Sequence, residues 1–211
     1  IDLSKVLGTG EEGRITKRDL ESVSSSKVSI PAFVGKENSR DVRVSQMRKT
    51  IAKRLSESKN GAPHFYLTME IDMSRCVDAR ESINAVADSK ISFNDFVIKA
   101  VAAALRQHPK VNSSWLGDHI RINHHIHIGV AVAVEEGLLV PVMRFADGKT
   151  LTQIGTEVRN YAVKAKDKKL QPSDWEGNTF TISNLGMFGI EEFTAIINPP
   201  DACILAVGGI K

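Results

Sequence analysis

The sequence is poor in cysteine, in aromatic residues and in long apolar runs. Its two cysteines, Cys76 and Cys203, are too few and too far apart for a disulfide framework or a zinc motif, which favours a reducing compartment. No apolar run approaches the roughly 20 residues of a membrane-spanning helix, so we expect no membrane segment. Aromatic residues make up 6% of the chain and do not alternate with basic ones, which argues against nucleic acid as a partner.

Several common enzyme motifs are also missing. The sequence contains no G-x-S-x-G nucleophile turn, no G-x-x-x-x-G-K-[ST] phosphate loop and no H-E-x-x-H zinc helix. Gly8, Gly10 and Gly13 form a G-x-G-x-x-G pattern, but a serine-rich stretch follows in place of the second strand of a dinucleotide-binding unit. We therefore expect these glycines to form a tight loop rather than a cofactor site.

The histidines do not predict a metal site. His125 and His127 form a His-x-His pair with His124 beside them, but no Asp, Glu or Cys stands nearby at the spacing of a third ligand. We expect these three imidazoles to be exposed or packed. His64 lies between Pro63 and Phe65 at a predicted strand start, and we expect a half-buried structural histidine there.

Positive charge is concentrated at the beginning of the chain. The net charge is +3, and residues 1–60 contain 13 Lys or Arg against 8 Asp or Glu, which favours an acidic protein partner. A compact charged segment, 1–23, is followed by a predicted linker, 24–42, with three consecutive serines and scattered charge. The remaining residues, 43–211, suffice for one main domain.

Periodicity predicts both helices and strands in residues 43–211. Met47, Ile51 and Leu55 recur at helical spacing among basic residues, and this stripe needs a surface to cover. Residues 65–71 alternate apolar and polar side chains, which predicts a strand with one buried face. We expect helices at 45–60, 74–87, 93–107 and from Thr150 onward, further strands at 178–183, 193–197 and 202–208, and a hairpin over 126–143. Because no regular strand-helix-strand repeat is present, this order favours a mixed sheet flanked by helices.

Residues 180–190 combine a predicted strand with a turn rich in glycine. The strand ends in Ser183 and Asn184, and Gly186 and Gly189 follow. From these residues alone, Ser183 is a turn serine, and a chemical role for it stays open.

Five segments resemble one protein family in order and spacing. They are PHFYLT (63–68), SFNDF (92–96), GVAV with GLLVPV (129–142), TFTISNLGMFG (179–189) and INPP (197–200). The family is that of the dihydrolipoyl acyltransferases, which form the core of 2-oxo acid dehydrogenase complexes, and the similarity extends over 43–211. The turn LGMFGI (185–190) is most similar to the acetyl-transferring members, which serve pyruvate dehydrogenase, rather than to the succinyl or branched-chain members.

The resemblance implies a fold and a reaction. The fold is a two-layer α/β arrangement, similar to that of chloramphenicol acetyltransferase, with a mixed sheet and helices. The reaction transfers an acetyl group from acetyl-dihydrolipoamide to coenzyme A without a metal. A histidine deprotonates the attacking thiol, and a serine hydroxyl stabilises the oxyanion. Ser183 matches that catalytic serine, and Arg80, Ser92 and Asn184 match positions that contact coenzyme A, although roles as a solvated arginine and two capping groups stay open.

The family's histidine lies in an Asp-His-Arg-x-x-Asp-Gly motif. These 211 residues contain no such motif, and none of the six histidines matches it. Two interpretations stay open. The sequence is part of an active acyltransferase, or it is a related dehydrogenase-binding protein that keeps the fold as a structural core component without the histidine.

The N-terminal residues also resemble a known module. Residues 1–23 are similar to part of the peripheral subunit-binding domain, a small helical module whose first helix has no counterpart here. Arg14 and Lys17 match its basic positions, which implies docking of dihydrolipoyl dehydrogenase and of the pyruvate decarboxylase component. The resemblance further implies a homotrimer within a cubic or icosahedral core, a lipoyl group carried outside these residues, and a location in the bacterial cytoplasm or the mitochondrial matrix.

Overall fold

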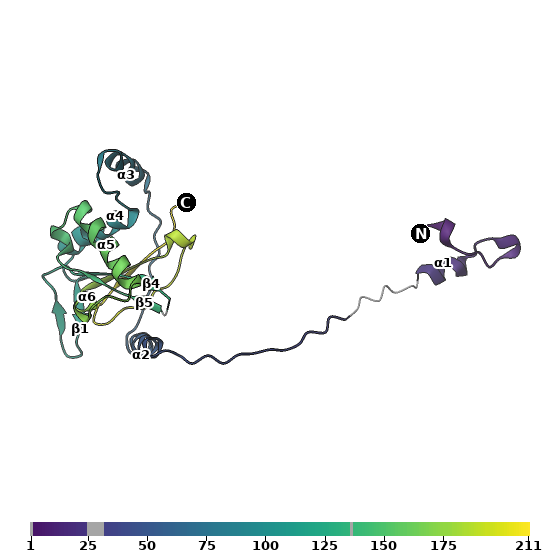
Figure 1. Ribbon diagram of the computed structural model, residues 1–211, viewed down its shortest axis with the longest axis horizontal. Coiled ribbons are helices and arrows are strands. Elements are labelled where there is room, and N and C mark those ends of the chain that lie inside the picture. The colour runs from purple at the N-terminus through teal and green to yellow at the C-terminus, as the bar shows by residue number, and fades with distance from the viewer. Residues whose placement is uncertain (1, 25–31, 136) are drawn as a thin grey trace. The chain divides into compact units, whose positions relative to one another are not determined.

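A computed structural model describes residues 2–24, 32–135 and 137–211 of the chain (Figure 1). The chain divides into two compact units, Ile1–Val42 and Arg43–Lys211, and each is described by itself. Two predicted features lie outside the described residues: most of the serine-rich part of the expected linker, at 25–31, and Glu136 in the expected hairpin turn.

The N-terminal unit is built around one buried carboxylate. It contains two short 3-10 helices, η1 (Leu3–Lys5) and η2 (Glu11–Gly13), and one α-helix, α1 (Lys17–Ser24). Asp19 of α1 accepts hydrogen bonds of 2.7 to 3.0 Å from the backbone N–H groups and the hydroxyls of Thr9 and Thr16. These donors, the backbone N–H of Thr9 foremost, hold the pKa of Asp19 well below its ordinary value.

Gly8, Gly10 and Gly13 lie in one loop, where glycine is needed for close approach at Gly8 and for a positive φ at Gly13. A Cβ added to Gly8 would lie 2.3 Å from the carbonyl oxygen of Gly13, and Gly13 itself has a φ of +77°. The N–H of Gly10 donates to the carbonyl of Arg14 at 2.9 Å. The expectation of a tight loop is confirmed, because the glycines bring the loop backbone into contact with itself.

A four-stranded mixed sheet forms the centre of the larger unit. Its strand order is β6 (Val142–Met143), β3 (Ile128–Val130), β7 (Phe180–Asn184) and β8 (Ile204–Val207). β6 runs antiparallel to β3, whereas β3, β7 and β8 run parallel to one another. The predicted mixed sheet is confirmed.

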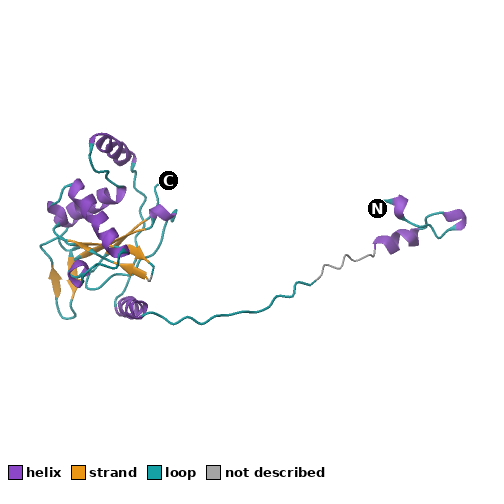
Figure 2. Ribbon diagram, viewed as in Figure 1, coloured by secondary structure: helices purple, strands orange, loops and turns teal. Residues whose placement is uncertain are grey.

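Helices pack against this sheet to form the core (Figure 2). α4 (Phe93–Gln107) contributes Ile98, and α5 (Leu151–Lys166) contributes Ile154. Both side chains are fully buried against Ile128 of β3 and Ile182 of β7. The other described helices of the unit are α2 (Gln46–Gly61), α3 (Ser74–Val86), α6 (Pro172–Trp175) and the 3-10 helices η3 (Ala146–Gly148) and η4 (Gly186–Phe188). The layered α/β fold class is confirmed.

Reciprocal side-chain caps begin both α4 and α5. The Ser92 hydroxyl accepts from the Asp95 N–H, and the Asp95 carboxylate accepts from the Ser92 N–H at 2.8 Å. Thr150 and Gln153 form the same reciprocal pair at the start of α5. Each pair satisfies two N–H groups that a helix start would otherwise leave without partners.

The predicted hairpin over 126–143 forms in two parts. Beyond the β3–β6 ladder, β4 (Val132–Val134) pairs antiparallel with β5 (Gly137–Leu139). The two parts are separated where the Ala131 N–H donates to the carbonyl of Ile182 in β7. A second hairpin, β1 (Ser113–Trp115) with β2 (Ile120–Ile122), was not predicted, and its strands have only three residues each.

Two predicted strands, 65–71 and 193–197, are wrong. Neither segment forms a strand or pairs with a described strand, and Phe65, Leu67, Met69 and Ile71 are 73 to 83% exposed. The hydroxyl of Thr68 in the first segment donates to the carboxylate of Glu192, which directly precedes the second segment, at 2.8 Å. Alternation indicates an extended chain, but a strand also needs a neighbour that completes its hydrogen bonds.

The apolar stripe of α2, formed by Met47, Ile51 and Leu55, is only partly buried by the rest of the chain. Ile51 reaches the hairpin, because a Cβ added to Gly137 would lie 2.9 Å from its Cδ1 atom, whereas Met47 stays 37% exposed. The hydroxyl of Ser58 donates to the carbonyl of Ile197 at 2.6 Å and anchors the end of the helix. The basic helix therefore packs on its own chain through Ile51 and Ser58, while Met47 stays partly exposed.

Candidate active site

Ser183 lies next to the last residue of β7, at the carboxyl end of the three parallel strands. Phe180 and Ile182 of β7 enter the core beneath the helices, so Thr181 and Ser183 project from the opposite face of the strand. Ser183 is half-buried, and its hydroxyl makes no hydrogen bond with any residue that the structure describes. The hydroxyl is therefore free to donate to a ligand.

The turn after Ser183 is fixed by the side chain of Asn184. Its Oδ1 atom accepts from the Gly186 N–H at 2.9 Å, and its Nδ2 atom donates to Oδ1 of Asn94 in α4 at 3.1 Å. The turn continues as η4 and ends at Gly189, whose φ of +72° favours glycine. One side chain thus joins the end of β7, the turn and the first turn of α4.

Close backbone contacts hold the same turn against the end of β8. A Cβ added to Gly186 would lie 2.6 Å from the carbonyl oxygen of Gly208. A Cβ added to Gly208 would lie 1.9 Å from the carbonyl oxygen of Glu191. Two main-chain hydrogen bonds join these segments, from the Leu185 N–H to the Val207 carbonyl and from the Gly209 N–H to the Ile190 carbonyl. Glycine is needed here for close approach.

Arg80 of α3 is attached to the start of α4. Its Nε atom donates to the carbonyl of Ile91 at 3.0 Å, and its guanidinium lies 4.5 Å from the centre of the Phe93 ring. Ser92, the cap of α4, lies between those two residues. The structure therefore brings the predicted residues Arg80, Ser92 and Asn184 together around the first turn of α4, with Ser183 directly before Asn184.

Two segments of the chain match known protein families. Residues 36–211 match the 2-oxoacid dehydrogenases acyltransferase (catalytic domain) family, and residues 1–21 match the e3 binding domain. The chain belongs to the 2-oxoacid dehydrogenase acyltransferase family. The resemblance inferred from the sequence is thereby confirmed.

Relatives and solved structures agree with this family. The chain is 45% identical over 226 residues to the dihydrolipoyllysine-residue acetyltransferase component of the Schizosaccharomyces pombe mitochondrial pyruvate dehydrogenase complex, covering 99% of the chain and 47% of that protein. A dihydrolipoamide acetyltransferase structure from Azotobacter vinelandii, in whose mechanism a serine, a histidine and an asparagine were investigated, gives a TM-score of 0.79 at 32% identity, covering 85% and 78%. The structure of the cubic core of a pyruvate dehydrogenase multienzyme complex gives a TM-score of 0.79 at 33% sequence identity. The match covers 85% of this chain and 78% of that chain. The chain spans about half the length of the curated relatives it matches.

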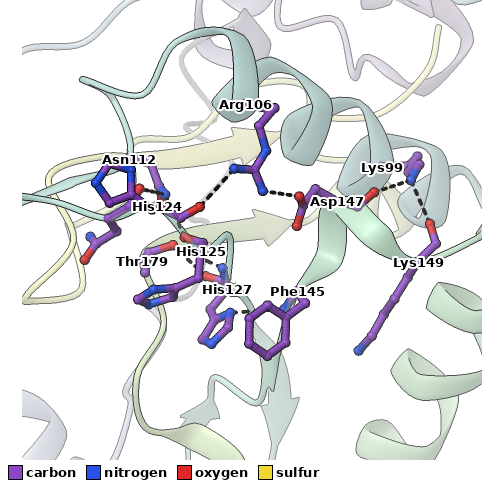
Figure 3. Close-up of polar contacts among 11 residues, drawn as sticks. Lys99, Arg106, Asn112, His124, His125, His127, Phe145, Asp147, Lys149 and Thr179 are labelled. Carbon is purple, nitrogen blue, oxygen red and sulfur yellow. Dashed lines mark hydrogen bonds and ion pairs between the residues drawn. The ribbon is translucent and has the colours of Figure 1, made fainter.

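The clustered histidines of this family member have packing roles (Figure 3). His127 is buried, and its Nδ1 atom accepts from the N–H of Phe145 at 3.0 Å. The two rings meet edge to face, with His125 on the other side of His127. Burial lowers the pKa of His127, which favours the neutral ring that an accepting Nδ1 atom requires. The expectation of packed or exposed imidazoles is confirmed.

His64 uses both of its ring nitrogens in the fold. Nδ1 lies 2.7 Å from the carbonyl of Ala62, and Nε2 accepts from the N–H of Ile197 at 3.2 Å. Because a backbone N–H can only donate, the proton of the neutral ring is on Nδ1. The expected half-buried structural histidine is confirmed, and neither nitrogen is free to accept a proton from a substrate.

The described residues contain neither a candidate metal site nor a candidate membrane-spanning helix. Among them, no group of three or more His, Cys, Asp and Glu side chains could hold a metal ion. No helix in the described ranges is long and apolar enough to cross a bilayer.

Asp201 lies on the face of β7 from which Thr181 and Ser183 project, and the sequence analysis did not single it out. Its Oδ2 atom accepts from the hydroxyl of Thr181 and from Nδ2 of Asn178, both at 2.6 Å. Its Oδ1 atom is buried and has no partner among the described residues. Burial raises the pKa of Asp201 to about 6, against the opposing effect of its two donors. An aspartate directly after two prolines and before an apolar strand was the available signal.

Asn94 was also missed as part of the site. An asparagine in the first turn of a helix is common and does not by itself indicate a functional contact. The bond of Asn94 to Asn184 joins residues 90 positions apart. No local signal predicts such a contact.

In the N-terminal unit, the predicted docking residues Arg14 and Lys17 are both exposed. The Nζ atom of Lys17 lies 3.8 Å from Oε1 of Glu21 on the same helix.

Proposed function

We propose that this chain is an acyltransferase core subunit that transfers an acetyl group from acetyl-dihydrolipoamide to coenzyme A in a pyruvate dehydrogenase complex, and that it serves as a scaffold of that complex. The observation that carries the proposal is the free hydroxyl of Ser183 at the end of a parallel strand, on a turn held by Asn184 and by glycine contacts. The 45% identity to an enzyme named for acetyl transfer supports the choice of acyl group.

The reaction needs one stabilising donor at the carbonyl oxygen. The thiolate of coenzyme A attacks the thioester carbonyl of acetyl-dihydrolipoamide, a new carbon–sulfur bond forms, and negative charge develops on the oxygen. The hydroxyl of Ser183 donates to that oxygen in the transition state. The bond to the dihydrolipoamide sulfur then breaks, and that sulfur takes up the proton that the coenzyme A thiol gave up.

The general base is not among the histidines whose bonds the structure fixes. His64 has both ring nitrogens engaged, and Nδ1 of the buried His127 is engaged with Phe145. We assign the base to a histidine of the family's Asp-His-Arg-x-x-Asp-Gly motif, which these 211 residues do not contain.

The residues proposed to contact coenzyme A fit that role unequally. Arg80 is half-buried, and only its Nε atom is bonded within the described chain, so its terminal N–H groups can donate to an anionic group. The hydroxyl of Ser92 accepts from Asp95 and keeps its own proton to donate. Asn184 already makes two bonds within the fold, so its contribution to coenzyme A is the smallest of the three.

We propose a homotrimer within a larger cubic or icosahedral core as the working assembly. The likeness to a cubic core supports it, and so do the exposed apolar side chains at 65–71 and the partly covered stripe of α2, which would be buried by a second subunit.

Residues 1–23 would form a docking domain joined by the linker 24–42 to the catalytic domain 43–211. Arg14 and Lys17 would bind dihydrolipoyl dehydrogenase or the pyruvate decarboxylase component, supported by the e3 binding domain match. The lipoyl group would arrive on another domain, in the bacterial cytoplasm or the mitochondrial matrix.

The test is Ser183→Ala in the full-length assembled polypeptide, assayed with dihydrolipoamide and acetyl coenzyme A. Loss of an oxyanion donor should lower kcat about a hundredfold and leave KM nearly unchanged. Ser82→Ala is the matched control, because Ser82 is exposed on α3 and donates only within that helix. An unchanged kcat for Ser183→Ala would remove this serine from the mechanism. Succinyl and branched-chain thioesters in the same assay separate acetyl transfer from the other activities of the family, and no turnover with any of them would favour a structural core protein.

A further inference from the structure

We propose that Asn94 is a positioning residue that acts on catalysis through Asn184 and the turn that follows Ser183. The inference rests on the proposed role of Ser183 and adds a residue of α4 to that site. Asn94 touches no reacting atom in this proposal. Its function is to keep the end of β7 at a fixed place relative to the start of α4.

The direction of each hydrogen bond in this network follows from one backbone group. The N–H of Gly186 can only donate, so the atom of Asn184 that faces it at 2.9 Å is the carbonyl oxygen Oδ1. The other amide atom of Asn184, Nδ2, then faces Asn94 and is a donor. Asn94 must therefore accept through its own Oδ1 atom, at 3.1 Å. A carboxylate at position 94 could accept equally well, whereas an alanine could not.

This bond is the one direct side-chain hydrogen bond between α4 and the end of β7 within the described residues. The other side of the turn is held differently, by glycine contacts and main-chain bonds to the end of β8. Without Asn94, the turn would keep its support from β8 and lose its support from α4. Ser183 itself is held by the register of β7 with β8, so the expected change is a loss of alignment and not of the fold.

The capped start of α4 makes Asn94 a rigid support. Ser92 and Asp95, on either side of it in the first turn, satisfy each other's backbone N–H groups, and Ile98 one turn later is fully buried. A side chain on such an element is placed more accurately than one on a loop. The Asn94 side chain is half-buried, which limits competition from water for its bond to Asn184.

The experiment compares Asn94→Ala, Asn94→Asp and Ser183→Ala, alone and combined, in the full-length assembled polypeptide. Asn94→Ala should lower kcat about five- to tenfold, as expected for one lost hydrogen bond, with KM within about twofold. Asn94→Asp should retain most of the activity because it keeps the acceptor. In the Ser183→Ala background, Asn94→Ala should cause no further loss, because a residue that acts through Ser183 has nothing left to position.

Asn160→Ala is the matched control, since Asn160 is exposed on α5, and it should leave kcat unchanged. The proposal is overturned if Asn94→Ala keeps full activity, if Asn94→Asp is as impaired as Asn94→Ala, or if the losses multiply in the double variant. Failure of the proposed function has a different result: Ser183→Ala alone then retains full turnover. Thermal unfolding of each variant and its elution as an assembly separate loss of alignment from loss of structure.

Discussion

Two segments of the larger unit carry the same alternating sequence pattern and have opposite surroundings. In β7, Phe180 and Ile182 are buried and the strand is paired on both sides, by β3 and β8. In residues 65–71, the alternating apolar side chains are 73 to 83% exposed and no described strand pairs with them. The comparison shows that alternation alone does not make a strand, because neighbouring strands decide whether a segment is paired and its apolar face buried.

The largest expected effect is a difference in stability between truncating a buried side chain of β7 and truncating an exposed one in residues 65–71. Ile182→Ala should lower the free energy of unfolding by about 3 kcal/mol, because it opens a cavity in a fully buried site. Leu67→Ala should cost about 0.5 kcal/mol or less in the monomeric chain, since Leu67 is 83% exposed. Urea unfolding of both variants measures the difference. Equal losses in the monomer would show that residues 65–71 are buried in solution, and a loss confined to the assembled form would place Leu67 at a subunit contact.

The next prediction concerns Asp201, which accepts a hydrogen bond from Thr181 on the polar face of β7. Because the folded-state pKa of Asp201 is raised to about 6, the folded chain binds a proton that the unfolded chain has lost between about pH 4 and pH 6. Stability should therefore fall as the pH rises through this window, by roughly 2 to 3 kcal/mol from this group. Asp201→Asn should flatten the decline, as urea unfolding at pH 4 and pH 7 would show. A wild-type decline that survives in Asp201→Asn must come from another group.

A smaller effect is expected at Gly208, which directly follows β8 and packs against the segment after the β7 turn. Gly208→Ala places a Cβ 1.9 Å from the carbonyl oxygen of Glu191, so the backbone must shift, at a cost of about 2 kcal/mol. Gly148→Ala is the control, because a Cβ there meets no atom within 4 Å. Thermal unfolding gives the ranking. Equal melting temperatures for the two variants would show that the turn is looser than its contacts indicate.

Much of the fold could be predicted from local patterns in the sequence. Ser92 with Asp95 and Thr150 with Gln153 are short-range pairs, so the starts of α4 and α5 can be read directly from the chain. The helices at 46–61 and 74–86 and the hairpin after Ile126 follow from periodicity. Strands 65–71 and 193–197 could not be judged in this way, because pairing depends on residues far away in the sequence.

The candidate site was predictable only in part. Ser183, Asn184, Arg80 and Ser92 were named from the family resemblance, which preserves positions without giving contacts. The bonds of Asn184 to Asn94 and of Asp201 to Thr181 join residues that are 90 and 20 positions apart. A polar residue at such a position has the same local sequence signals whether it faces water or a buried partner.

The sequence by itself determined where the helices of the larger unit begin, which strands are apolar enough for a core, and to which family the chain belongs. These depend on caps, periodicity and motifs within a few residues of one another. The tertiary structure decided which alternating segment became a paired strand, which polar groups support Ser183, and why Gly208 has no side chain. Those outcomes depend on hydrogen bonds and close contacts between distant segments, which exist only once the chain has packed.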